Sequence, residues 1–99
     1  MDAEKVKILL TVLREGSFSA AARLLGYTTS GISRSIASLE EEAGMKLLVR
    51  GKNGIRATKE AESLLPAMRD LVRQSEICRE QIRQLHGLET GTVTIGISY

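Results

Sequence analysis

"TTSGISRSIASLEEEAG", residues 28–44, has the apolar period of a helix but a composition that disfavours one. Ile32, Ile36 and Leu39 recur at intervals of four and three residues, which predicts a buried helical stripe. Most residues between them are serines, with a threonine and a glycine near the start, and these are poor helix formers. We predict a helix over residues 29–43 that carries its small side chains on the face opposite the stripe.

Two shorter helices are expected before this segment. The stretch between Asp2 and Gly16 has leucines and valines at helical spacing, with Asp2 as a candidate cap and the glycine as a stop. The next stretch, capped by Ser17 or Ser19, ends at Gly26. Two short helices joined by a tight glycine-containing turn form a helix-turn-helix, whose second helix can enter the DNA major groove.

A hairpin is expected after the helix-turn-helix. "MKLLVRGKNGIRAT", residues 45–58, is an apolar run, a turn-rich centre and a second short run. Asn53 and Gly54 form a dipeptide that favours positive φ in a tight turn. Directly after a helix-turn-helix, such a hairpin would be a wing.

A long helix is expected from Thr58 to about His86. Pro66 inside it predicts either a kink or a later start, because proline cannot donate a backbone hydrogen bond. Apolar and small residues alternate at steps of four and three along it. This stripe outlasts the small core, so we predict that it pairs with a second chain; the alternative is packing against the chain's own first helix. The expected dimer-interface residues are Leu64, Met68, Leu71, Ser75, Cys78, Ile82 and Leu85.

The final stretch, "GTVTIGISY", residues 91–99, alternates apolar and small polar residues as a strand does. A strand with no partner is not stable alone, so the sequence resembles the front of a longer protein, cut just inside the next domain. We therefore expect a winged helix-turn-helix over residues 1–57, a linker and dimerisation helix over 58–87, and a hinge with the first strand of a truncated C-terminal domain over 88–99.

Charge is distributed unevenly along the 99 residues, whose net charge is +2. Residues 1–57 carry nine Lys or Arg against six Asp or Glu, whereas residues 58–99 carry five against six. The basic excess therefore belongs to the expected helix-turn-helix and wing, which favours a nucleic-acid partner.

Several classes of function find no support in the sequence. The single Cys78 and single His86 provide neither a disulfide nor the ligands of a zinc site, so no metal or other cofactor is expected. The sequence has no nucleophile–base pair and no phosphate loop, so we do not expect an enzyme. It also lacks a membrane-spanning run and a signal peptide, so we expect a cytoplasmic protein without membrane contact.

Three motifs together resemble the N-terminal region of LysR-type transcriptional regulators. "GSFSAAARLLGYT" (residues 16–28) resembles the family's G-S-F-x-x-A-A-x-x-L opening, and "SGISRSIASLEEEAGMKLLVR" (residues 30–50) resembles its S-R-x-I-x-x-L-E-x-x-x-G-x-x-L-x-x-R helix. "GIRATKEA" (residues 54–61) resembles the wing and the entry to the linker. The spacings agree in register without a gap over residues 16–61.

This resemblance implies a mainly α fold: a winged helix-turn-helix of three helices and a two-stranded wing, followed by a long dimerisation helix. It also implies a bacterial activator or repressor in which a C-terminal domain, absent here, binds a small-molecule co-inducer. Such regulators form homodimers through the linker helix and often tetramers.

The expected DNA contacts come from one helix face and the hairpin. Arg34 can grip guanine with two hydrogen bonds, although it could instead be a surface ion-pair partner of Glu41. The neighbouring hydroxyls could equally be ordinary surface groups, and the hairpin merely solvated. Glu40 is expected to hold a neighbouring helix or backbone rather than DNA. The full set of expected DNA-binding residues is Thr29, Ser30, Ser33, Arg34, Ser38, Arg50, Lys52, Asn53 and Arg56.

One departure from the family pattern concerns the start of the recognition helix. Thr29 and Ser30 stand where family members frequently have Gln followed by Pro or Ser, and threonine cannot make the bidentate adenine contact of glutamine. The function we expect is sequence-specific regulation of transcription by a dimer on double-stranded DNA. The alternative is a winged-helix module for protein contacts, which would bind DNA weakly.

Overall fold

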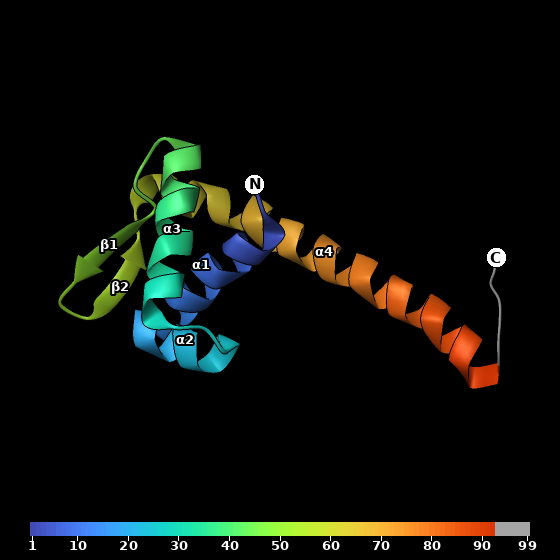
Figure 1. Cartoon of the computed structure of the whole chain (residues 1–99). Helices are drawn as coiled ribbons and strands as arrows, with labels where there is room; N and C mark the ends of the chain where they lie inside the picture. The colour runs from blue at the N-terminus through green and yellow to red at the C-terminus, as the bar shows by residue number, and fades with distance from the viewer. Residues whose placement is uncertain (93–99) are drawn as a thin grey trace.

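The computed structural model describes residues 1–92. Four helices and one two-stranded antiparallel sheet form this part of the chain (Figure 1). The predicted mainly α, winged helix-turn-helix architecture with a long following helix is confirmed. In chain order the elements are α1 (Ala3–Glu15), α2 (Phe18–Leu25), α3 (Thr29–Ala43), β1 (Leu48–Gly51), β2 (Gly54–Ala57) and α4 (Lys59–Thr92).

The first three helices begin and end where the sequence predicts. Asp2, Ser17 and Thr28 each accept a hydrogen bond from a backbone N–H of the following turn, at 2.9 to 3.0 Å. Of the two candidates, Ser17 and not Ser19 caps α2. Each such cap stabilises its helix by about 1 kcal/mol relative to alanine, and each helix ends at a glycine in the left-handed region.

The core forms where α1, α2 and α3 meet. The predicted stripe of α3 is buried, with Ile32, Ile36 and Leu39 exposing 4% of their surface or less. Full burial of such a side chain contributes roughly 1.5–3 kcal/mol. The core is completed from outside the three helices by Leu47, Ile55, Ala61 and Met68.

The predicted wing is present, but its turn lies one residue earlier than the Asn53–Gly54 dipeptide indicates. Gly51 pairs with Gly54, so Lys52 and Asn53 form the turn and Gly54 begins β2. The positive φ of Gly54, 108°, also determines how the wing docks on the helices. It lets the strand pass directly over the backbone carbonyl of Gly16, which accepts a 3.2 Å hydrogen bond from the Ile55 N–H.

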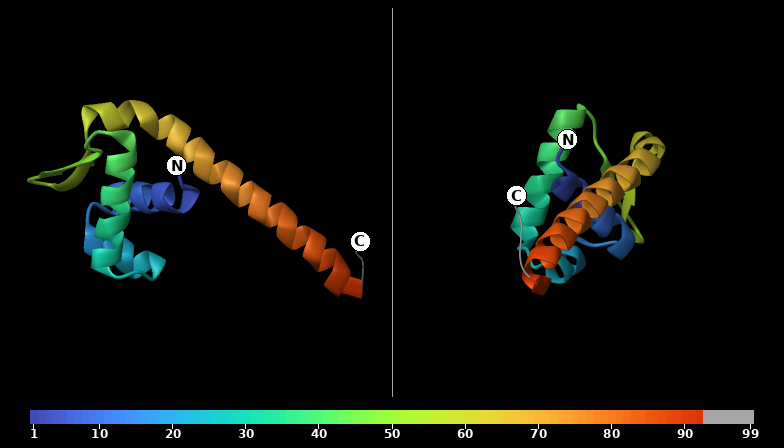
Figure 2. Two further views of the ribbon diagram at one scale, coloured as in Figure 1. Left: turned by 45° about the horizontal axis from the view of Figure 1, so that its top comes forward. Right: turned by 90° about the vertical axis from the view of Figure 1, so that its right-hand side faces the viewer.

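Helix α4 begins at Lys59, where the Thr58 hydroxyl accepts a hydrogen bond from the Ala61 N–H at 3.1 Å. The predicted later start is therefore wrong, and the helix continues through Pro66. Its ribbon changes direction in the early, yellow part that contains this proline (Figure 2, left), as loss of one backbone hydrogen bond favours.

The far end of α4 projects from the head, the unit formed by residues 1–57. The helix reaches Thr92, beyond the expected end near His86, so the beginning of the expected hinge over residues 88–99 is helical instead. The predicted strand after Thr92 lies outside the described residues. Among the helices of residues 1–92, none has both the length and the apolar character needed to cross a membrane.

Gly54→Ala should destabilise the fold by about 1–3 kcal/mol, because strained backbone and a steric conflict coincide there. A Cβ at this position would lie 2.9 Å from the Gly16 carbonyl oxygen. Urea unfolding measures the change. Gly87→Ala is the matched control: its added Cβ meets nothing within 4 Å, so it should leave stability unchanged or raise it by up to about 1 kcal/mol. Equal effects of the two substitutions would contradict this account of Gly54.

Candidate nucleic-acid interface

The outer face of α3 is polar, small and exposed. Thr29, Ser30, Ser33 and Arg34 are all exposed, and of these Ser30 and Arg34 point most directly away from the buried stripe. Within the described residues Arg34 makes neither a hydrogen bond nor an ion pair, so the alternative pairing with Glu41 does not occur. Its five N–H donors are therefore available to an external ligand.

Ser38 differs from the other predicted residues of α3. Its side chain is half-buried, and its hydroxyl accepts a 2.9 Å hydrogen bond from the Lys5 ammonium group of α1. This contact holds α3 against α1 at the edge of the exposed face. It also brings the positive charge of Lys5 towards that edge.

A hollow separates the start of α3 from the wing. The Arg50 guanidinium lies over the Phe18 ring, 5.2 Å from its centroid, a cation–π arrangement that contributes about 0.5–1 kcal/mol at exposed sites. This contact ties the wing to the first turn of α2. The hollow is lined by Gly16, Ser17, Phe18, Ser19, Thr29, Ser30, Ser33, Arg50, Gly51, Gly54 and Ile55.

Strand pairing divides the predicted basic residues of the wing between its faces. Arg50 lies opposite Ile55 and shares the inner face with it, whereas Arg56 pairs with Val49 on the outer face. Lys52 and Asn53 occupy the tip, which projects to one side of α3 (Figure 1). The wing therefore presents positive charge in three directions and not as one patch.

Glu40 positions the wing, as the sequence predicts for this residue. One carboxylate oxygen accepts hydrogen bonds from the backbone N–H groups of Leu47 and Leu48, at 2.8 and 3.2 Å. The other lies 3.6 Å from the ammonium group of Lys46. A charged acceptor forms stronger hydrogen bonds with backbone donors than a neutral one does. Glu40 therefore fixes the start of β1 relative to α3.

Sequence reasoning missed the contribution of α2 to this site. Ser17 and Ser19 were considered only as caps, and Phe18 was not singled out, yet all three line the hollow. The two-residue period of a strand, applied to the hairpin, would have separated Arg50 from Arg56. No signal in the sequence pairs Phe18 with Arg50, because that contact depends on how the wing docks.

Part of the predicted dimer stripe of α4 is buried within the chain itself, and the rest is exposed. Met68 is 4% exposed and lies in the chain's own core, which leaves little of its side chain available to a second chain. Leu64 is half-buried against the same core, and half-buried Ser75 faces the start of α1. Packing against the first helix, the alternative reading, is therefore correct for this part. The exposed remainder consists of Leu71, Cys78, Ile82 and Leu85.

Within the described residues no group of three or more His, Cys, Asp or Glu side chains could hold a metal ion. The three helices of residues 1–57 and the two-stranded wing define the class of winged helix-turn-helix domains.

Comparison with known proteins identifies the family. Residues 3–62 match the bacterial regulatory helix-turn-helix proteins of the lysR family, and the chain belongs to that family. It is 35% identical to the probable HTH-type transcriptional regulator LrrA of Synechococcus elongatus over 96% of the chain and 32% of LrrA. It is also 35% identical to the HTH-type transcriptional activator BauR of Pseudomonas aeruginosa, over 97% of the chain and 32% of BauR.

A solved structure with the same fold contains DNA. The BenM DBD in its complex with catB site 1 DNA superposes with a TM-score of 0.77 and 26% identity, covering 90% of this chain and 100% of that one. The chain thus spans about a third of the length of its curated relatives. It contains the helix-turn-helix domain of the lysR family, and both relatives are named as transcriptional regulators.

Glu40→Gln should destabilise the domain by about 1–2 kcal/mol, because two backbone N–H groups would lose a charged acceptor. Urea unfolding measures this loss. Glu41→Gln, at an exposed neighbouring position, is the matched control and should change stability by less than about 0.5 kcal/mol. If the two variants unfold alike, Glu40 does not hold the wing.

Proposed function

We propose that this chain binds double-stranded DNA sequence-specifically as a homodimer, with α3 in the major groove and the wing on the backbone or in the minor groove. The observation that carries the proposal is the exposed face of α3, on which Arg34 stands among small hydroxyl side chains. A major groove about 12 Å wide admits an α-helix. Small residues on its outer face let the helix backbone approach the base edges.

Within this proposal the residues of α3 make different contacts with the DNA. Arg34 reads a guanine through its O6 and N7 acceptors, since a guanidinium can form both hydrogen bonds at once. Thr29, Ser30 and Ser33 bind phosphate oxygens or base edges through their hydroxyls. Ser38, already bonded to Lys5, contributes at the edge by orienting that ammonium group towards the phosphates.

The wing residues contact different parts of the duplex because their side chains point in different directions. Lys52 and Asn53 at the tip reach the backbone or the minor groove. Arg50, beside the hollow, binds a phosphate close to the start of α3. Arg56 contacts the DNA from the outer face of the wing. The solved complex of the BenM DBD with catB site 1 DNA supports DNA as the ligand of this domain.

The exposed apolar side chains of α4 support dimerisation. Leu71, Cys78 and Leu85 recur every seven residues, and Ile82 lies beside them on the same face. Ile82 and Leu85 expose 50% and 65% of their surface. A second copy of the chain would cover this stripe and hold two copies of α3 at a fixed separation, which suits an inverted-repeat site.

The proposal for the whole protein goes further than this chain. Its relatives are about three times as long, which leaves room for a domain that binds a small-molecule co-inducer. Residues 88–99 would lead into that domain. The full-length protein is proposed to act in the cytoplasm and to assemble as a dimer or a tetramer.

Selection of bound duplexes from a random DNA pool, followed by titration at several salt concentrations, tests the function. We expect an inverted repeat whose binding weakens steeply with salt, because bound phosphates release counterions. Recovery of no motif, with selected and arbitrary duplexes bound equally, would refute sequence-specific binding and favour the alternative of a protein-contact module.

Arg34→Ala should weaken binding to the selected duplex by roughly 1–3 kcal/mol and affect arbitrary duplex much less. Lys52→Ala should instead weaken binding to every sequence and lower the salt slope by about one. Fluorescence anisotropy against both duplexes separates the two roles. Arg23→Ala removes an exposed cation from α2 as a control. An Arg34→Ala variant with unchanged discrimination would remove Arg34 from the readers.

Leu71→Glu or Leu85→Glu should weaken dimerisation by about 30-fold or more, since an unpaired charge would be buried at the interface. Sedimentation equilibrium measures the dissociation constant. Ile77→Glu is the matched control, because Ile77 is 43% exposed but lies well round the helix from the stripe. Equal effects of all three substitutions would contradict the proposed interface.

A further inference from the structure

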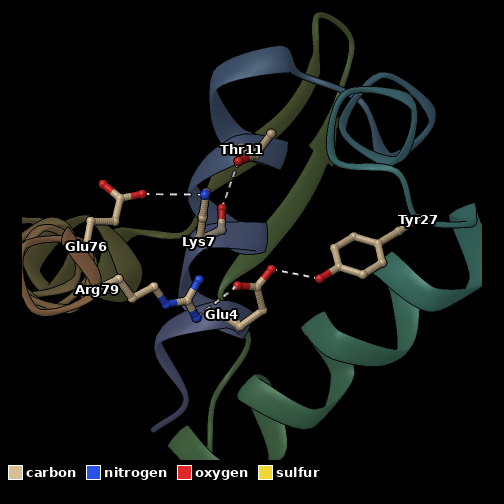
Figure 3. Close-up of polar contacts among 6 residues, drawn as sticks. All are labelled: Glu4, Lys7, Thr11, Tyr27, Glu76 and Arg79. Carbon is tan, nitrogen blue, oxygen red and sulfur yellow. Dashed lines mark hydrogen bonds and ion pairs between the residues drawn. The ribbon is translucent and has the colours of Figure 1, made fainter. Parts of the chain in front are cut away.

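Two ion pairs join α4 to α1 where α4 leaves the head (Figure 3). The Lys7 ammonium group lies 3.4 Å from a Glu76 carboxylate oxygen, and an Arg79 guanidinium nitrogen lies 4.0 Å from a Glu4 carboxylate oxygen. We call these four residues the clasp. Each helix contributes one acid and one base, three positions apart and therefore on one face.

The clasp is anchored to the helix-turn-helix itself. Tyr27, in the turn between α2 and α3, donates a 2.7 Å hydrogen bond from its hydroxyl to the second oxygen of Glu4 (Figure 3). This bond raises the pKa of the Tyr27 phenol above its ordinary value, because ionisation would lose it. Glu4 thus connects three parts of the chain: its own helix α1, helix α4, and the turn that precedes α3.

Contacts of two kinds hold α4 against the head. Closer to the start of α4, Ala61, Met68 and Val72 pack against the core. The clasp adds two contact points farther along, about one helical turn apart. Beyond Arg79, residues 80–87 are all exposed. The clasp therefore lies where α4 leaves the head and enters its exposed part.

The length of the projecting helix amplifies any change at the clasp. From Arg79 to Thr92 the helix extends about 20 Å at a rise of 1.5 Å per residue. A rotation of about 10° at the clasp would displace its end by about 3.5 Å, close to the rise of one DNA base pair. The contribution of exposed ion pairs to stability is small, so their value here lies in orientation.

We propose that Glu4, Lys7, Glu76 and Arg79 are positioning residues that set the direction of α4 and thereby the spacing of half-sites that a dimer accepts. The spacing role rests on the proposed function, because it requires two heads joined through α4. The orienting role concerns one chain and can be measured without DNA. The clasp would act on specificity without touching a base, through the separation of the two recognition helices.

The test compares Lys7→Glu, Glu76→Lys and the double variant that exchanges the two charges. Anisotropy titrations use the selected inverted repeat, the same repeat with one base pair added between its halves, and a single half-site. We expect the wild type to prefer its own spacing by about tenfold or more, and each single variant to reduce this preference below about threefold. The double variant should restore it, while half-site affinity stays within about twofold throughout.

A distance measurement tests orientation directly. Spin labels replace Arg23 on α2 and Gln84 on α4 in a Cys78→Ser background, and excess unlabelled chain restricts the signal to distances within one chain. We expect a narrow distribution with the native charges, a shifted or broader one in each single variant, and recovery in the double variant. Glu80→Lys, which makes the same charge change at a residue paired with Arg83 of α4 itself, should leave both readouts unchanged.

Each result decides one part of the proposal. Single variants that keep both the spacing preference and the distance distribution would overturn it, as would a double variant that restores neither. If no inverted repeat binds better than a single half-site, the dimeric function fails and the spacing role with it. The spin-label distances would still decide whether the clasp orients α4.

Discussion

The packing of Ile32, Ile36 and Leu39 against α1 and α2 is the constraint on which the rest of the structure depends. This stripe is narrow, so burying it leaves most of the circumference of α3 to solvent. The exposed face can then consist of small polar residues and Arg34 without loss of core packing. The stripe that stabilises the core and the face proposed to bind DNA are thus different sides of one helix, and helical periodicity keeps them apart.

The wing depends on the same core through its backbone. Glu40, on α3, holds the two N–H groups at the start of β1, and the Gly16 carbonyl holds the N–H at the start of β2. One tether therefore lies at the base of the hairpin and the other beside its turn, whose residues Lys52 and Asn53 are exposed. Arg50, resting on Phe18, links the inner face of the wing to α2. The orientation of the basic residues follows from these tethers rather than from their own charge.

Helix α4 has two neighbouring faces of different character. Ala61, Met68 and Val72 face the chain's own core, and the clasp extends this face with charges (Figure 3). Leu71, Cys78 and Leu85 form the apolar face that is left over. A helix that is attached along one side and apolar along the next is suited to transmit the position of one head to another.

The sequence by itself determined the elements, because the signals for them are local. Side-chain caps at Asp2, Ser17 and Thr28 and glycines at the helix ends act within a few residues, and the period of Ile32, Ile36 and Leu39 identifies its own buried face. The exposed face of α3 and its candidate residues follow from the same period. The family motifs can be recognised in the sequence because they too are local patterns.

Only the tertiary structure decided which other part of the chain each side chain contacts. The 3.5-residue stripe of α4 could not reveal that Met68 belongs to the core and Leu85 to the outside, since both fit one pattern. Nor could spacing reveal the contacts of Lys5 with Ser38, Phe18 with Arg50, or Arg79 with Glu4. These contacts join residues far apart in the chain, and only the packing of whole elements brings them together.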